Sequence, residues 1–96
     1  MSDAADPRAA LVECREAIER IDRRIVELIA ERTAIGRRTS TLKRTAGLPI
    51  LDPKREAEVI RRAVATAREH SLAIEPVREI FWHVVGISRR AQLEEG

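Results

Sequence analysis

Apolar residues recur every three or four positions through the first half of the chain. Between Pro7 and about Thr45 the apolar positions at this spacing are Leu11, Cys14, Ile18, Ile21, Ile25, Leu28, Ile35 and Leu42. The spacing is typical of a helix with a heptad seam. The segment Ala46-Gly47-Leu48-Pro49 interrupts it. The pattern therefore predicts one very long N-terminal helix.

Two shorter periodic segments follow, and each opens with an acidic residue and a proline. Asp52-Pro53 gives the second an N-cap and a proline at the first helical position, and its apolar stripe runs to His70-Ser71. Glu75-Pro76 opens the third, which carries apolar residues at 77, 80, 81, 84, 85 and 87. We expect an all-α chain of three helices forming a single domain over residues 1–96, with residues 1–7 as a flexible tail.

The length of the first helix argues for a second chain. A helix of roughly 36 residues is about 54 Å long, whereas a compact domain of this size has a radius of gyration of about 12–13 Å. Two shorter helices from the same chain cannot cover such a seam. We therefore expect an intertwined homodimer paired along the first helix. A monomer whose first helix bends at Gly36 is the alternative.

Composition narrows the classes of function. The chain has 18 Lys and Arg against 16 Asp and Glu, without a basic block, and its aromatic residues are Phe81 and Trp82. This disfavours a nucleic-acid partner. The single cysteine excludes an internal disulfide and a Cys-based zinc site. With no secretory signal pattern and no run of 18 apolar residues, we expect a cytoplasmic protein without a membrane partner.

Two cations lie where the seam should be apolar. Arg32 occupies a seam position, and Lys43 follows eleven residues later, within about 20° on the helical wheel. A buried charge needs a carboxylate or an anionic ligand. Internal salt bridges and a small anion bound between the two cations both satisfy this need, and the pattern leaves both open. Ser88 and Gln92 extend the apolar face of the third helix, so they either face solvent or line a polar pocket.

Polar residues also gather at the start of the second helix. Capping and the helix dipole account for Asp52 and Glu56, but Arg55 opposes the dipole, which suggests another role. Arg15 lies beside the seam of the first helix. It is about 25 Å from Arg32 along an ideal helix and about 100° around it. The two arginines could share a small ligand only across an antiparallel dimer.

Taken together, these residues resemble the all-helical class of chorismate mutases. The resemblance covers nearly the whole chain and rests on Leu11 to Arg15, Ile21-Asp22, Ala30-Glu31-Arg32, Lys43, Asp52-x-x-Arg55-Glu56, Phe81 and Ser88-x-x-x-Gln92. It implies an intertwined dimer with two equivalent sites. The reaction it implies is the [3,3] rearrangement of chorismate to prephenate, in aromatic amino-acid synthesis, without a metal or cofactor.

The resemblance assigns catalytic roles to four residues. Arg15, from the other chain, and Arg32 would hold the two carboxylates of the substrate and lock its reactive conformation. Lys43 and Gln92 would donate hydrogen bonds to the ether oxygen, where negative charge develops in the transition state.

Four further residues would bind the substrate. By the resemblance, Glu56 and the backbone near Asp52 receive the ring hydroxyl, while Ser88 and Arg55 complete the carboxylate pocket.

Other functions remain open. Isochorismate-pyruvate lyases share the fold, but they lack the acidic pair that Asp52 and Glu56 form here. A mutase acting on 4-amino-4-deoxychorismate is a second alternative, because Glu56 could also accept an amino group. A third is a non-catalytic helical dimer that docks onto a pathway enzyme. Such an enzyme could also activate a catalytic dimer.

Overall fold

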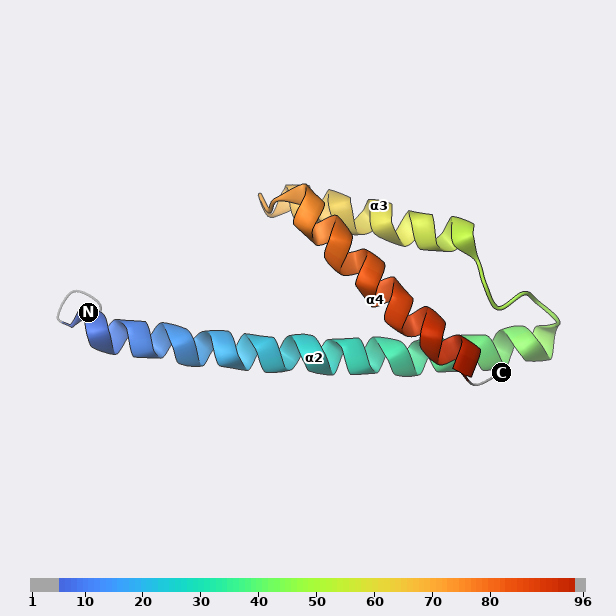
Figure 1. The fold of residues 1–96 in the computed structure, drawn as a ribbon, viewed down its shortest axis with the longest axis horizontal. Helices are drawn as coiled ribbons and strands as arrows, with labels where there is room; N and C mark the ends of the chain where they lie inside the picture. Colours follow the sequence, from blue (N-terminus) through green and yellow to red (C-terminus); the bar gives the residue numbers. More distant parts are fainter. Residues whose placement is uncertain (1–5, 95–96) are drawn as a thin grey trace. The chain divides into compact units, whose positions relative to one another are not determined.

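The computed structural model describes residues 6–94, which form three helices and contain no strand (Figure 1). The helices are α2 (Pro7–Ala46), α3 (Pro53–Glu69) and α4 (Ile74–Glu94). The predicted all-α chain, with one very long helix and two shorter ones, is confirmed. Of the predicted tail, residues 1–5 lie outside the described residues, and Pro7 is already the first residue of α2.

The chain divides into two compact parts, Met1–Glu31 and Arg32–Gly96. The first part contains the N-terminal portion of α2. The second contains the C-terminal portion of α2 together with α3 and α4. All contacts that form the candidate site described below lie within the second part.

Capping residues account for the helix bounds. Asp6 caps α2, since its side chain accepts a hydrogen bond from Arg8 N at 3.0 Å. The end of α2 is a Schellman motif in which Gly47 has φ +70°. Leu48 N donates to Lys43 O at 2.8 Å there. At the start of α3, Asp52 Oδ1 accepts from Arg55 N at 3.0 Å, and Pro53 follows. The end of α2 at Gly47 and the start of α3 at Asp52-Pro53 are the breaks that the sequence predicts, whereas the Asp6 cap was not predicted.

The core of the second part includes the contact between α3 and α4, two helices that diverge from their connecting turn (Figure 1). The buried apolar residues are Ile60, Ala63, Val64 and Ala67 of α3 and Val85 and Ala91 of α4. The α3 residues follow the i, i+3, i+4, i+7 spacing of one helix face. Three of these six side chains are alanines, so the two helices can approach closely. Ser40 of α2 is fully buried, and its hydroxyl donates to Arg37 O at 2.8 Å.

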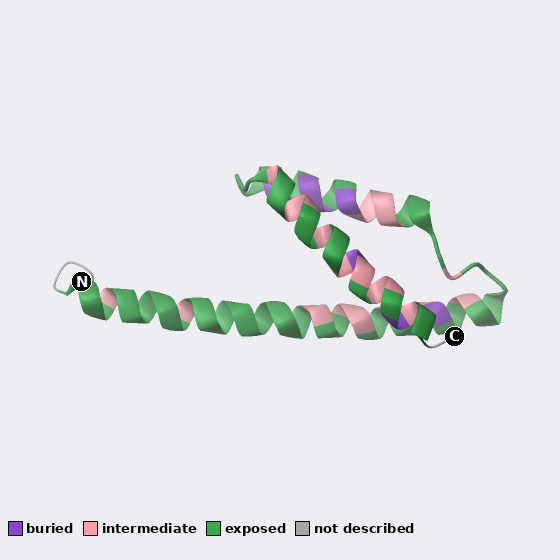
Figure 2. Ribbon diagram, in the orientation of Figure 1, coloured by how far each residue is buried: buried purple, intermediate pink, exposed green. Residues whose placement is uncertain are grey.

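Apolar residues of the α2 seam are exposed. Figure 2 shows most of the N-terminal portion of α2 as exposed. Ile18 and Ile21, for example, are 55% and 58% exposed. In the second part, Ile35 and Leu42 are exposed as well. Helix α2 continues through Gly36.

No helix within residues 6–94 combines the length and the apolar character that crossing a bilayer requires.

Candidate active site

A cavity of about 270 Å³ lies in the second part of the chain, lined by residues of all three helices and of the α2–α3 connection. Its polar lining residues are Arg32, Thr39, Lys43, Asp52, Arg55, Glu56, Ser88, Arg89 and Gln92. Seven of the eight residues that the sequence singled out are therefore brought together. The eighth, Arg15, belongs to the first part of the chain, where it is exposed.

The two cations of α2 that line the cavity are held by neutral oxygen atoms. Arg32 Nη1 donates to Ser88 Oγ at 2.6 Å, and Lys43 Nζ donates to Ile50 O at 3.0 Å. Because a lysine ammonium carries three donors and a guanidinium five, each side chain keeps further N–H groups for a ligand. Both are half-buried beside the cavity. Of the two explanations for charges on the seam, this arrangement favours an anionic ligand.

Gln92 is anchored by the backbone of α2. Its Nε2 donates to Gly36 O at 3.1 Å, which leaves its second N–H for another acceptor. A Cβ at Gly36 would lie 3.5 Å from Ser88 Cβ and 3.8 Å from Gln92 Nε2. Both Ser88 and Gln92 are therefore directed toward α2, and not toward solvent.

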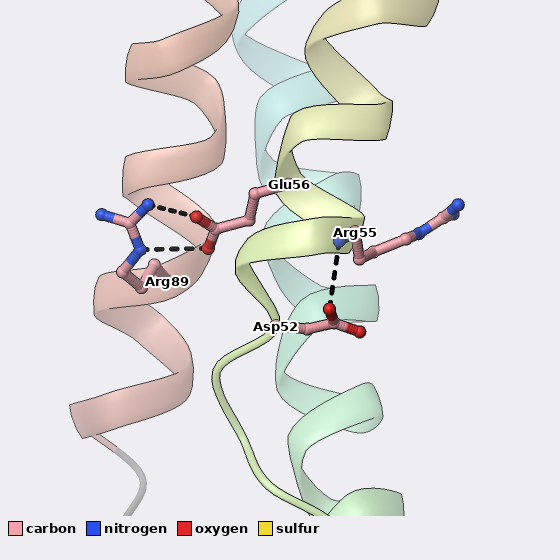
Figure 3. A network of polar contacts seen from close by, with 4 residues as sticks. All are labelled: Asp52, Arg55, Glu56 and Arg89. Carbon is pink, nitrogen blue, oxygen red and sulfur yellow. Dashed lines mark hydrogen bonds and ion pairs between the residues drawn. The ribbon is translucent and has the colours of Figure 1, made fainter.

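At the start of α3, the side chains of the neighbouring residues Arg55 and Glu56 point in different directions (Figure 3). The Arg55 guanidinium points away from Glu56, and it lies 3.6 Å from Glu58. The Glu56 side chain points to α4, where it accepts two hydrogen bonds from Arg89. Asp52 is occupied in part by capping α3.

Arg89 is the lining residue that the sequence analysis missed. Its Nε donates to Glu56 Oε2 at 3.0 Å and its Nη2 to Glu56 Oε1, a bidentate ion pair. The pKa of Arg89 is raised by these hydrogen bonds and by the negative charge of Glu56, against a smaller opposite effect of burial. A signal existed, because position 89 is four residues after Val85 and three before Gln92, on the same face of the third helix.

The charges around the cavity favour an anion. The charged lining residues are four cations, Arg32, Lys43, Arg55 and Arg89, against the carboxylates of Asp52 and Glu56. Within residues 6–94, no three His, Cys, Asp or Glu side chains come together in a group that could hold a metal ion. The site can therefore hold a small anion with several directed hydrogen-bond donors.

Comparison with known families gives this arrangement a context. The sequence model of the family "Chorismate mutase type II" matches residues 14–93, which include parts of α2 and α4, all of α3 and every residue that lines the cavity. The chain belongs to this chorismate mutase family. The resemblance stated from the polar residues is thereby confirmed.

Individual chorismate mutase relatives are similar over part of the chain. A protein named chorismate mutase from Methanocaldococcus jannaschii is 37% identical over 62 residues, which are 65% of this chain and 63% of that protein. A bifunctional chorismate mutase/prephenate dehydratase from Aquifex aeolicus is 37% identical over 59 residues, 62% of this chain and 16% of that protein. The chain thus spans less than two thirds of the length of these relatives.

A solved structure supports the fold of this family member. A conserved hypothetical protein from Pyrococcus furiosus aligns with a TM-score of 0.68 and 35% sequence identity, covering 86% of this chain and 95% of that chain.

Proposed function

We propose that this chain is a chorismate mutase that converts chorismate to prephenate as a homodimer. The observation that supports this most directly is the convergence of Arg32, Lys43 and Gln92 on one cavity, from α2 and α4. The substrate is a dianion whose rearrangement breaks an ether bond while a carbon–carbon bond forms. A catalyst for this reaction needs a cavity with cations that bind the carboxylates and hydrogen-bond donors that contact the ether oxygen.

The carboxylates are held by two arginines. Arg32 already donates to Ser88 Oγ, so its guanidinium is fixed beside the cavity and its remaining N–H groups can bind one carboxylate in a bidentate contact. The partner subunit's Arg15 binds the other. Holding both carboxylates keeps the enolpyruvyl arm over the ring, which removes much of the entropic part of the barrier.

The ether oxygen receives hydrogen bonds from Lys43 and Gln92. Each side chain is anchored to a backbone carbonyl, Ile50 O for Lys43 and Gly36 O for Gln92. The donors are therefore oriented before the reaction begins, and they stabilise the negative charge that develops on the oxygen in the transition state. Glu56 accepts a hydrogen bond from the ring hydroxyl, and Ser88 and Arg55 complete the pocket around the carboxylates.

The homodimer is proposed from the uncovered seam. Apolar residues at heptad spacing along α2 are about half exposed, among them Leu11, Ile18 and Ile25. A second copy of α2 carries the same pattern, so antiparallel pairing covers both seams. That pairing also brings Arg15 of the partner subunit toward Arg32. A partner enzyme that activates this dimer stays a prediction.

Turnover of three substrates, measured side by side, tests the proposed function. The purified protein should convert chorismate to prephenate without added metal, and faster than it consumes isochorismate or 4-amino-4-deoxychorismate. Release of pyruvate from isochorismate, with chorismate left intact, would make the protein a lyase. Consumption of none of the three would favour a non-catalytic helical dimer.

Gln92→Glu should make the activity decline as pH rises. A glutamine amide donates at every pH, whereas a carboxylic acid donates only when it is protonated. The ionised side chain would also face the Gly36 carbonyl oxygen, which accepts from Gln92 in the wild type. The measurement is kcat against pH for the wild type, Gln92→Glu and Gln92→Met. The methionine variant cannot donate, so its activity should be low at every pH. If the profile of Gln92→Glu runs parallel to that of the wild type, Gln92 does not donate to the ether oxygen.

A further inference from the structure

An ion pair between α3 and α4 holds the carboxylate of Glu56, a hydrogen-bond acceptor, at one wall of the cavity. Arg89 of α4 contacts both carboxylate oxygens of Glu56 of α3, with Nε at 3.0 Å from Oε2 and a second contact from Nη2 to Oε1 (Figure 3). The Glu56 side chain is only 21% exposed and the Arg89 side chain 40%. Both residues line the cavity. The contact therefore fixes the orientation of the Glu56 carboxylate toward a ligand in the cavity.

The pair keeps Glu56 able to accept further hydrogen bonds. A carboxylate has about four lone-pair sites, and the fork of Arg89 uses one on each oxygen. The remaining sites can accept from a ligand. The guanidinium fork also restricts the rotation of the carboxylate, because two parallel contacts define its plane.

The pair also changes the charge that a ligand meets. An isolated carboxylate attracts a cation and a neutral donor alike, but a carboxylate in contact with a guanidinium has its charge largely offset. Arg89 cannot lose its own charge at any physiological pH. A positively charged ligand group at Glu56 would thus lie close to a permanent positive charge, and like charges at such distances repel.

We propose that Arg89 is a positioning residue that sets selectivity at the ring substituent of the substrate. By holding Glu56 and offsetting its charge, Arg89 makes the pair an acceptor for a neutral hydroxyl and disfavours a protonated amine at the same position. This inference rests on the proposed function. It identifies what separates chorismate from its 4-amino-4-deoxy analogue, whose amine is protonated at neutral pH.

The test compares kcat/KM for chorismate and for the amino analogue on the same preparations of wild type, Arg89→Met, Arg89→Lys and Arg90→Met. Arg90 is the matched control, because it is the next residue of α4, is exposed and lies outside the cavity lining. Since each preparation meets both substrates, the ratio of the two values does not depend on the fraction of folded protein.

In Arg89→Met, the ratio of kcat/KM for the amino analogue to kcat/KM for chorismate should rise by about tenfold, because the charge that opposes the ammonium is gone. Its kcat/KM for chorismate should fall by about tenfold or more, mainly through KM, since the hydroxyl contact exists in both ground and transition states. Arg89→Lys keeps the charge without the fork, so it should restore most of the ratio. Arg90→Met should match the wild type.

A double variant separates action through Glu56 from any direct role. If Arg89 acts through Glu56, the double variant Glu56→Gln/Arg89→Met should lose no more kcat/KM than Glu56→Gln alone. Two results would overturn the proposed role of Arg89. One is a double variant whose loss of kcat/KM equals the product of the losses in the two single variants. The other is an Arg89→Met variant that loses kcat/KM equally for both substrates. A wild-type protein that turns over neither substrate would instead overturn the proposed function, and the selectivity with it.

Discussion

Lys43→Ala should lower kcat by about a hundredfold to a thousandfold, the effect of removing one directed donor from a developing negative charge. Lys43 is half-buried beside the cavity, and its Nζ is held by Ile50 O at 3.0 Å. The ammonium provides both a positive charge and hydrogen bonds, whereas the Gln92 amide provides hydrogen bonds alone. Because the charge on the ether oxygen develops only in the transition state, the loss should fall on kcat far more than on KM.

Stability measurements distinguish this role from a structural one. The hydrogen bond that the folded protein loses is the contact between Lys43 and Ile50 O, worth about 1 kcal/mol. The thermal unfolding midpoint should therefore change little. Lys43→Met, which keeps the apolar stem, should lose as much kcat as the alanine variant. Lys54→Ala is the matched control, since Lys54 is exposed and outside the cavity lining. A large fall in the unfolding midpoint with kcat preserved would make Lys43 a structural residue.

The elements of this fold could be read from the sequence because local chemistry sets their bounds. Asp52 caps α3 with a side-chain oxygen, and Gly47 adopts the positive φ that ends α2. These interactions involve residues a few positions apart, so they are visible in the order of the amino acids. The same holds for the spacing of Arg32 and Lys43 along one face of a single helix.

Contacts between helices were harder to predict. The pair of Glu56 and Arg89 joins residues 33 positions apart on different helices, and its formation depends on how α3 and α4 pack. Arg55 and Glu56 are adjacent in the sequence, and their positions alone do not show that their side chains point in different directions. The Arg55 guanidinium points away from Glu56 and lies near Glu58. Both outcomes depend on side-chain directions, which periodicity does not determine.

Arg15→Ala and Lys43→Ala should each be nearly inactive alone, and mixing the two should restore about a quarter of the wild-type activity. The expectation follows from the symmetry of the proposed dimer. Each site takes Lys43 from one subunit and Arg15 from the partner subunit. A mixed dimer therefore has one site with both changes and one site with neither. Random exchange of subunits makes about half of the dimers mixed, and half of the sites in these are intact.

The experiment refolds the two variants together, each with a different tag, and measures turnover of the mixture, where about a quarter of the sites are intact, and of the purified mixed dimers, where about half are. The matched control is a mixture of Arg32→Ala with Lys43→Ala. Both residues line the cavity from the same chain, so every site in that mixed dimer keeps one defect and no activity should return. If Arg15 instead acts within its own chain, the first mixture also keeps one defect in each site. Mixed dimers that form but stay inactive would therefore place Arg15 outside the shared site, whereas recovery in the first mixture alone identifies it as the residue contributed by the partner subunit.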